Sequence, residues 1–213
     1  MMVGQISLNL SLCIYMFLYL PQIIHNQQQI DLTGLSKWMH LILYLAYFLD
    51  LLYGFGINLP WQYRVVSAVG LLLMTTQHLQ FIRHFKYQKQ KRPQTTFYSI
   101  LICSSAILVW GISQKPFASV SLTYIGYISQ SAFVLALIPQ ILKSKQLQSA
   151  QAINIVYIIL NLLLATLDCI SAWLLKWGWP NEIGASLTVL LTSVLLVQYC
   201  QYVKYVDNST IPI

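Results

Sequence analysis

Long apolar runs, separated by short polar segments, make up almost the whole chain. Each run has about the 20 residues that a helix needs to cross roughly 30 Å of hydrocarbon. The pattern predicts seven membrane-spanning helices, over residues 6–24, 35–54, 63–83, 96–113, 121–142, 152–175 and 183–204. Few residues remain for a soluble domain. We therefore expect an all-α integral membrane protein.

The composition supports this class of protein. Apolar residues make up 57% and charged residues 8% of the chain, whereas soluble domains average about 45–50% and about 25%. The first run could instead be a signal peptide, but Met1 to Ser7 contains no lysine or arginine. Tyr15, Tyr19 and Pro21 also stand where small residues would form a cleavage site. We expect a membrane span here.

Basic residues are unevenly distributed between the predicted loops. If the N-terminus lies outside, the inner segments hold nine of them: Lys37, Arg83, Lys86, Lys89, Lys91, Arg92, Lys143, Lys145 and Lys204. The outer loops hold three: Arg64, Lys115 and Lys176. Because cytoplasmic loops carry the excess of lysine and arginine, we expect an outer or lumenal N-terminus and a cytoplasmic C-terminus. Topology also explains the net charge of +7, so the expected partner is the lipid bilayer and not nucleic acid.

The sequence repeats at a distance of 118 residues. The matched pairs are Pro21-Gln22-Ile23 with Pro139-Gln140-Ile141, Asp50 with Asp168, Trp61 with Trp179, Gln80 with Gln198, and Lys86-Tyr87 with Lys204-Tyr205. The predicted span 96–113 has no counterpart, and it supplies the extra crossing that gives both units the same orientation. The pattern predicts two parallel three-helix repeats, residues 1–92 and 119–213, joined by a linker helix within 93–118.

Two prolines interrupt the predicted spans at equivalent positions, Pro21 and Pro139. Proline removes a helical hydrogen bond and clashes with the preceding turn, so it kinks a helix and frees backbone carbonyls. The adjacent Gln22 and Gln140 carry amides that need partners at this depth. We predict that these four residues form hinges; the alternative is that each proline only ends a helix.

Asp50 and Asp168 are the only acidic residues within the predicted spans. A carboxylate there costs about 2.5–3.5 kcal/mol on insertion scales and normally faces a cavity or a relay. We interpret both as candidates for reversible protonation, which proton coupling requires. The alternative is a carboxyl that only hydrogen-bonds to neighbouring helices.

Asn154, Asn161 and Asp168 are spaced by seven, which places them along one helix face. The equivalent residues of the first repeat are Ser36, Leu43 and Asp50. We therefore expect a substrate and proton site weighted towards the second repeat, although Asn161 alone could be an interhelical hydrogen bond. The predicted substrate-binding residues are Asn154, Asn161, Asp168, Gln80 and Gln198.

Cysteine and histidine show no metal-ligand or disulfide spacing. The residues are Cys13, Cys103, Cys169, Cys200, His25, His40, His78 and His84. We interpret them as packing residues or as interfacial and satisfied polar groups. No metal, disulfide or cofactor is expected.

Two Pro-Gln motifs at the inner ends of the first and fifth spans, each followed by a span with a deep aspartate, resemble the PQ-loop family. That family includes cystinosin and the lysosomal cationic amino-acid transporters, and it shares a seven-helix fold with SWEET sugar transporters and the KDEL receptor. The resemblance implies hinge roles for Pro21, Gln22, Pro139 and Gln140. It also implies proton-coupled substrate movement at Asp50 and Asp168.

The chain departs from the family pattern at several positions. Leu49 and Leu167 precede the deep aspartates where the family often has glycine. The small-residue pattern that follows the first Pro-Gln loop is kept as Gly34-Leu35-Ser36, but it becomes Ala152-Ile153-Asn154 in the second repeat. These differences concern the substrate more than the fold.

The favoured function is proton-coupled transport of a small polar metabolite, an amino acid such as a cationic one or cystine, by alternating access. A SWEET-like passive sugar facilitator and a non-transporting receptor are the alternatives, and the two buried acids argue against the facilitator. An enzyme is the weakest reading, because the sequence lacks paired carboxylates, a nucleophile with its base, or a metal cluster. A bacterial inner membrane and an endolysosomal membrane both remain open, and a monomer suffices.

Overall fold

The computed structural model describes residues 2–29, 32–56, 58, 61–114, 119–176 and 179–209. Within these ranges all regular elements are helices. They are α1 (Met2–Tyr15), α2 (Leu20–Gln28), α3 (Lys37–Gly56), α4 (Trp61–Tyr87), α5 (Lys91–Gln114), α6 (Ser119–Leu135), α7 (Leu137–Leu147), α8 (Ile155–Leu175) and α9 (Trp179–Ser209). Because α1 and α2 form one interrupted span, as do α6 and α7, the described chain has seven transmembrane helices. The predicted all-α, seven-helix class is confirmed.

Six of the seven are long and apolar enough to cross a membrane, within the residues described: Met2–Gln28, Lys37–Gly56, Trp61–Tyr87, Leu122–Leu147, Ile155–Leu175 and Glu182–Tyr202. The seventh, α5, has the length of a span, 24 residues, but its first turns are polar. It begins five residues before the predicted span. Pro93 is compatible with this earlier start because it lies in the first turn, where a missing N–H breaks no helical hydrogen bond.

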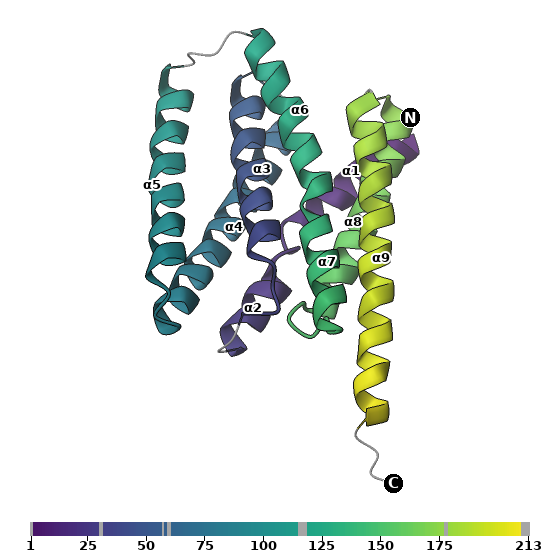
Figure 1. Cartoon of the computed structure of the whole chain (residues 1–213). Helices are drawn as coiled ribbons and strands as arrows, with labels where there is room; N and C mark the ends of the chain where they lie inside the picture. The colour runs from purple at the N-terminus through teal and green to yellow at the C-terminus, as the bar shows by residue number, and fades with distance from the viewer. Residues whose placement is uncertain are drawn as a thin grey trace.

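Helices of the two repeats begin at equivalent positions. Lys37 starts α3 and Ile155 starts α8, while Trp61 starts α4 and Trp179 starts α9, and both pairs are 118 residues apart. Figure 1 shows successive spans running in alternating directions, with α5, which connects the two units in the sequence, at the outer edge of the bundle beside the first unit. The start of α1 and the end of α9 lie at opposite ends of the bundle. The predicted 3+1+3 arrangement is therefore present.

The repeats pack against each other through α1 with α8 and through α3 with α6, while α5 lies against α4 and α3. The helices of the first repeat approach closely where Gly70 of α4 meets Tyr47 of α3. A Cβ on Gly70 would lie 2.1 Å from Cε1 of Tyr47, so only glycine fits here. This contact seats the Tyr47 ring inside the protein, where it is buried.

Both Pro-Gln motifs stand directly after a helix interruption. Residues 16–19 form turns between α1 and α2, and Pro21 lies at the start of α2. A single turn residue, Ala136, separates α6 from α7, and Pro139 is the third residue of α7. The interruptions occur because proline cannot donate the helical hydrogen bond and clashes with the preceding turn. The predicted breaks are thus present, and their role as hinges stays a prediction.

Candidate functional site

Gln22 is buried at the start of α2, and its amide bonds to the backbone of the other repeat. Its Nε2 donates to the carbonyl oxygen of Ala152 at 3.0 Å, and its Oε1 accepts from the backbone N–H of Asn154 at 2.8 Å. Both backbone groups belong to the segment that leads into α8. Nε2 also donates to Oδ1 of Asn26 at 2.7 Å. Gln22 therefore ties the first repeat to the entry of α8.

Gln140 makes the corresponding contacts in the opposite direction. Its Oε1 accepts from the backbone N–H of Ser36 at 2.6 Å, and its Nε2 donates to the carbonyl oxygen of Gly34 at 3.3 Å. Nε2 also donates to Oγ of Ser144 at 3.2 Å. Gly34, Ser36 and Ser144 are equivalent in the repeat to Ala152, Asn154 and Asn26. We call these reciprocal contacts of Gln22 and Gln140 with residues 152–154 and 34–36 the glutamine clamp.

The clamp brings equivalent residues of the two repeats together, as expected near the pseudo-two-fold axis of a parallel repeat. Gly34 and Ala152 occupy equivalent positions and face each other: a Cβ on Gly34 would lie 2.5 Å from the Cβ of Ala152. Leu35 and Ile153, the next residues, are both buried. The two segments thus touch without a gap, at the end of the bundle that holds α2 and α7 (Figure 1). We call this end the Pro-Gln end.

Gln80 and Gln198, predicted as substrate contacts, instead form hydrogen bonds to α2 and α7, the helices that contain the Pro-Gln motifs. Nε2 of Gln80 donates to the carbonyl oxygen of Ile23 at 2.9 Å, and Nε2 of Gln198 donates to that of Ile141 at 3.3 Å. Oε1 of Gln80 also accepts from Asn26 at 3.1 Å. Both side chains therefore have protein partners in this conformation, from α4 and α9 respectively.

Asn154 and Asn161 bond to different parts of the protein. Asn154 caps α8: its Oδ1 accepts from the backbone N–H groups of Val156 at 2.8 Å and Tyr157 at 3.4 Å, which satisfies donors at the helix start. Asn161 donates to Oγ1 of Thr192 on α9 at 3.2 Å. The structure does not link these two residues with Asp168 into one connected polar path.

Asp50 is buried and receives four side-chain donors. Tyr63 and Ser67 of α4 donate through their hydroxyl groups. From α6 of the other repeat, Ser129 donates at 3.2 Å and Nε2 of Gln130 at 3.3 Å. The Asp50 carboxylate therefore joins α3, α4 and α6.

Asp168 is half-buried and accepts from the hydroxyl of Tyr15 at 3.0 Å. Tyr15 lies on α1, so each aspartate is contacted by the first helix of the opposite repeat. The sequence predicted that Asp168 would have more polar partners than Asp50. This prediction is wrong, because the structure places more hydrogen-bond donors around Asp50. The donors of Asp50 come from α4 and α6, which the periodicity of α3 does not reveal.

Three tyrosines that sequence reasoning missed lie between the clamp and the aspartates. The hydroxyl of Tyr19 donates to that of Tyr47 at 3.0 Å. The ring centroid of Tyr19 lies 5.8 Å from that of Tyr47 and 5.6 Å from that of Tyr157. One sequence signal was available, because Tyr47 precedes Asp50 by three residues and so shares its helix face.

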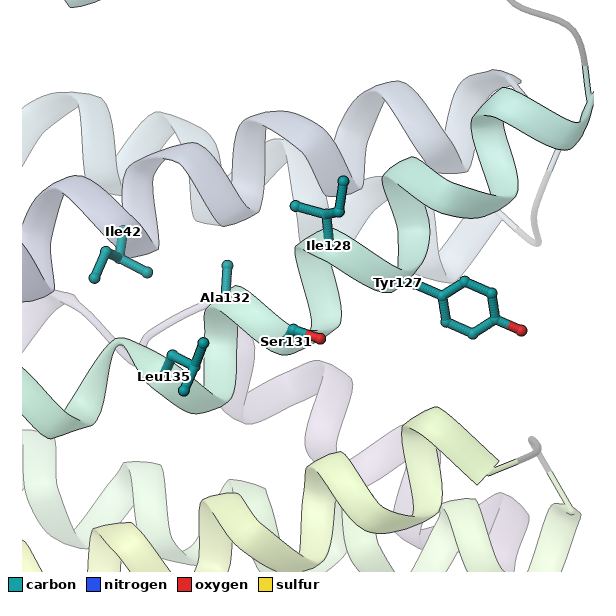
Figure 2. A pocket seen from close by; sticks show the side chains of 6 residues that line it. All are labelled: Ile42, Tyr127, Ile128, Ser131, Ala132 and Leu135. Atoms are coloured by element: carbon teal, nitrogen blue, oxygen red, sulfur yellow. The ribbon is translucent and has the colours of Figure 1, made fainter.

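A separate groove lies along α3 and α6, with a volume of about 380 Å³. Figure 2 shows the side chains that line it: Ile42, Tyr127, Ile128, Ser131, Ala132 and Leu135. The lining is almost wholly apolar and offers little to bind a polar metabolite. The groove is therefore not the candidate site.

The protein is a seven-helix membrane protein built from two three-helix repeats. Each repeat has a Pro-Gln break in its first span and an aspartate in its second. A sequence model of the PQ loop repeat matches residues 3–63 and 122–181. The chain belongs to the PQ-loop repeat family. Each matched segment contains one clamp glutamine and one deep aspartate. No curated protein and no solved structure matches the chain significantly.

Proposed function

We propose that the protein is a proton-coupled transporter of a small polar metabolite, an amino acid, that works by alternating access. Family membership and the membrane helices support a transport-related role. The observation that carries the proposal is the glutamine clamp. It joins the repeats at one end through a few hydrogen bonds, while both aspartates lie further along α3 and α8. A path past the aspartates would open when the clamp separates.

The breaks at Pro21 and Pro139 are the proposed hinges of this opening. Each break divides its span into two parts. The first part, α1 or α6, contacts the opposite repeat near the aspartate of that repeat. The second part, α2 or α7, carries a clamp glutamine. A bend at the break moves α2 or α7 while α1 or α6 keeps its contacts. Backbone groups freed by proline make such a bend less costly than in a continuous helix.

We expect Pro21→Ala and Pro139→Ala to lower the exchange rate several-fold while the protein still folds. Alanine restores the missing N–H and favours a straighter helix. The measurement is substrate exchange by purified, monodisperse protein in liposomes. Pro93→Ala, in the first turn of α5, is the matched control. Unchanged exchange in both variants would mean that the prolines only end helices.

Asp168 is the proposed proton carrier, with Asp50 in a supporting role. Asp168 is half-buried, and its side-chain partners Tyr15 and Ser11 both lie on α1, so it can gain or lose a proton without disturbing contacts among three helices. Protonation of Asp50 would disturb the hydrogen bonds that join three helices. This proposal agrees with the expectation from the sequence of a proton site weighted towards the second repeat.

The proposed substrate site combines Asp168 and Asn161 with the tyrosines Tyr19, Tyr47 and Tyr157. Aromatic faces beside a carboxylate suit an amino group, because both attract a cation. Asn154, Gln80 and Gln198 have protein partners while the clamp is closed. We propose that they become available to a substrate as the clamp opens.

Counterflow in proteoliposomes tests the function. The panel contains cationic, neutral and acidic amino acids, cystine and sugars, each with and without an imposed pH gradient. We expect counterflow of an amino acid and its accumulation when the gradient is applied. Sugar flux without pH dependence would instead indicate a passive facilitator, and binding without flux would indicate a receptor. Liposomes without protein are the control.

We also propose that the N-terminus lies outside or in the lumen, so that the Pro-Gln end faces the cytoplasm. The support is the excess of basic residues in segments at that end, nine against three. The labelling experiment in the Discussion tests this orientation, since an impermeant reagent reaches the clamp from one side of the membrane.

A further inference from the structure

Two histidines form a buried pair between α3, α4 and α5, apart from both aspartates. Nε2 of His40 lies 3.0 Å from Nδ1 of His78, and Nε2 of His78 lies 2.8 Å from the carbonyl oxygen of Phe97 on α5. The equivalent residues of the second repeat are Ile158 and Leu196. The repeat fold therefore does not require histidine at these positions.

The hydrogen bonds determine which nitrogens carry protons. A carbonyl oxygen only accepts, so Nε2 of His78 carries a hydrogen and donates it to Phe97. In a neutral imidazole the other nitrogen has a lone pair, so Nδ1 of His78 accepts from Nε2 of His40. The same rule leaves a lone pair on Nδ1 of His40. The chain of hydrogen bonds thus runs in one direction, from His40 to α5.

The row of hydrogen bonds starts at His40, whose Nδ1 is buried near the side-chain amide of Gln77. Nδ1 of His40 and Nε2 of Gln77 are buried atoms without a hydrogen-bond partner among the described residues. Gln77 directly precedes His78 on α4, and its buried side chain lies within reach of His40. While His40 is neutral, the amide N–H suits the lone pair. If Nδ1 gained a proton, Gln77 could turn its carbonyl oxygen towards it, because both amide ends are hydrogen-bonding groups.

Aromatic faces surround the pair. Phe97 stacks on both imidazoles, with ring centroids 6.0 Å from His40 and 4.6 Å from His78. Phe81 lies 4.8 Å from His40, and Tyr44 lies 4.8 Å from His78. Such faces attract a cation, so the cage offers a partner for an imidazolium that has no carboxylate beside it.

Among the residues that the structure describes, few titratable groups lie near the pair. From α3, Tyr44 faces His78 and bonds through its hydroxyl to Oγ of Ser104 at 2.7 Å. From α4, His84 lies nearly two turns beyond His78 and accepts from the backbone N–H of Leu32 at 3.4 Å. From α5, the described residues that meet the cage are Phe97 and Ser104, which carry no charge.

We propose that His40 and His78 form a proton-binding site, separate from the two aspartates, whose occupancy fastens the linker helix α5 to the first repeat. A proton from water adds to the lone pair on Nδ1 of His40, and no covalent bond in the protein breaks. The positive charge is shared across the hydrogen bond to His78. The bonds to His78 and to Phe97 then become charge-assisted, about twice as strong as neutral ones. Acid therefore tightens the attachment of α5.

The test uses the full chain in lipid nanodiscs, with isotope-labelled histidine for nitrogen NMR between about pH 8 and about pH 5. We expect Nδ1 of His40 to change from an unprotonated to a protonated nitrogen as the pH falls. Over the same range, backbone amides following Phe97 should exchange about tenfold more slowly, after correction for the intrinsic pH dependence of exchange.

A double variant, His40→Ile with His78→Leu, is the matched control. It gives the first repeat the apolar residues that the second repeat already has at these positions, so folding should survive. Acid-induced protection of α5 should disappear. The proposal is overturned if both imidazoles stay neutral down to about pH 5, or if the double variant shows the same protection. The wild-type NMR titration decides the first point even if the variant does not fold.

Discussion

Gln22→Leu opens the Pro-Gln end of the protein to an aqueous reagent. Leucine leaves the carbonyl oxygen of Ala152 and the backbone N–H of Asn154 buried without their partner, which costs about 1–3 kcal/mol for each group. In the open conformation water satisfies both groups, so the cost falls on the closed conformation alone. Because about 1.4 kcal/mol is a factor of ten, the open population rises at least several-fold. Gln140→Leu should act equally through Gly34 and Ser36.

The measurement is the alkylation rate of a cysteine introduced as Ile153→Cys. Ile153 is buried within the clamp, and the four native cysteines are first replaced. We expect each leucine variant to raise the rate about tenfold, and an impermeant reagent to act from the cytoplasmic side. Labelling from the opposite side would contradict the proposed orientation.

Matched controls exist on the same two helices. Gln27 of α2 and Gln146 of α7 are exposed, so Gln27→Leu and Gln146→Leu make the same chemical change away from the clamp. Their alkylation rates should equal that of the parent protein. If the clamp variants also matched the parent, the cross-repeat hydrogen bonds would not govern opening.

Asp168→Asn should abolish proton-driven accumulation and leave substrate-for-substrate exchange largely intact. Asparagine keeps the shape of a protonated carboxyl, and its Oδ1 can still accept from Tyr15, but it cannot titrate. Exchange persists because it does not require the empty carrier to return deprotonated. The measurement is uptake with and without an imposed pH gradient.

Asp50→Asn should instead lower stability and the overall rate, with little change in pH dependence. Its amide nitrogen would face the donors that surround Asp50, so hydrogen bonds from α4 or α6 are lost at about 1–3 kcal/mol. Thermal unfolding should show a lower midpoint for Asp50→Asn and little change for Asp168→Asn. Accumulation against a gradient by Asp168→Asn, but not by Asp50→Asn, would reverse the assignment.

Tyr15→Phe provides a control for the contact to Asp168. The equivalent residue in the second repeat is Phe133, so the change has a counterpart in the same fold. We expect gradient-driven uptake to persist with an altered pH dependence, because the carboxyl remains and only the Tyr15 donor is lost. Tyr15→Phe and Asp168→Asn therefore separate loss of the hydrogen bond from loss of the titrating group.

The sequence by itself determined the membrane spans, the repeat and the places where the first spans break. These features follow from local sequence: the length of an apolar run determines a span, and proline interrupts a helix. Because the same local signals recur after 118 residues, the helices of the two repeats begin 118 residues apart. A local rule could also have identified Asn154 as a cap, because asparagine directly before an apolar run is a helix-start signal.

Tertiary structure alone decided the partners of the polar residues. Gln22 bonds to backbone 130 residues away, and Asp50 receives donors from α6, about 80 residues further on. Helix periodicity reports which face a residue occupies, but it does not report which other helix covers that face. A buried amide or carboxylate needs donors and acceptors from any element within reach. Those partners exist only once the two repeats have packed together.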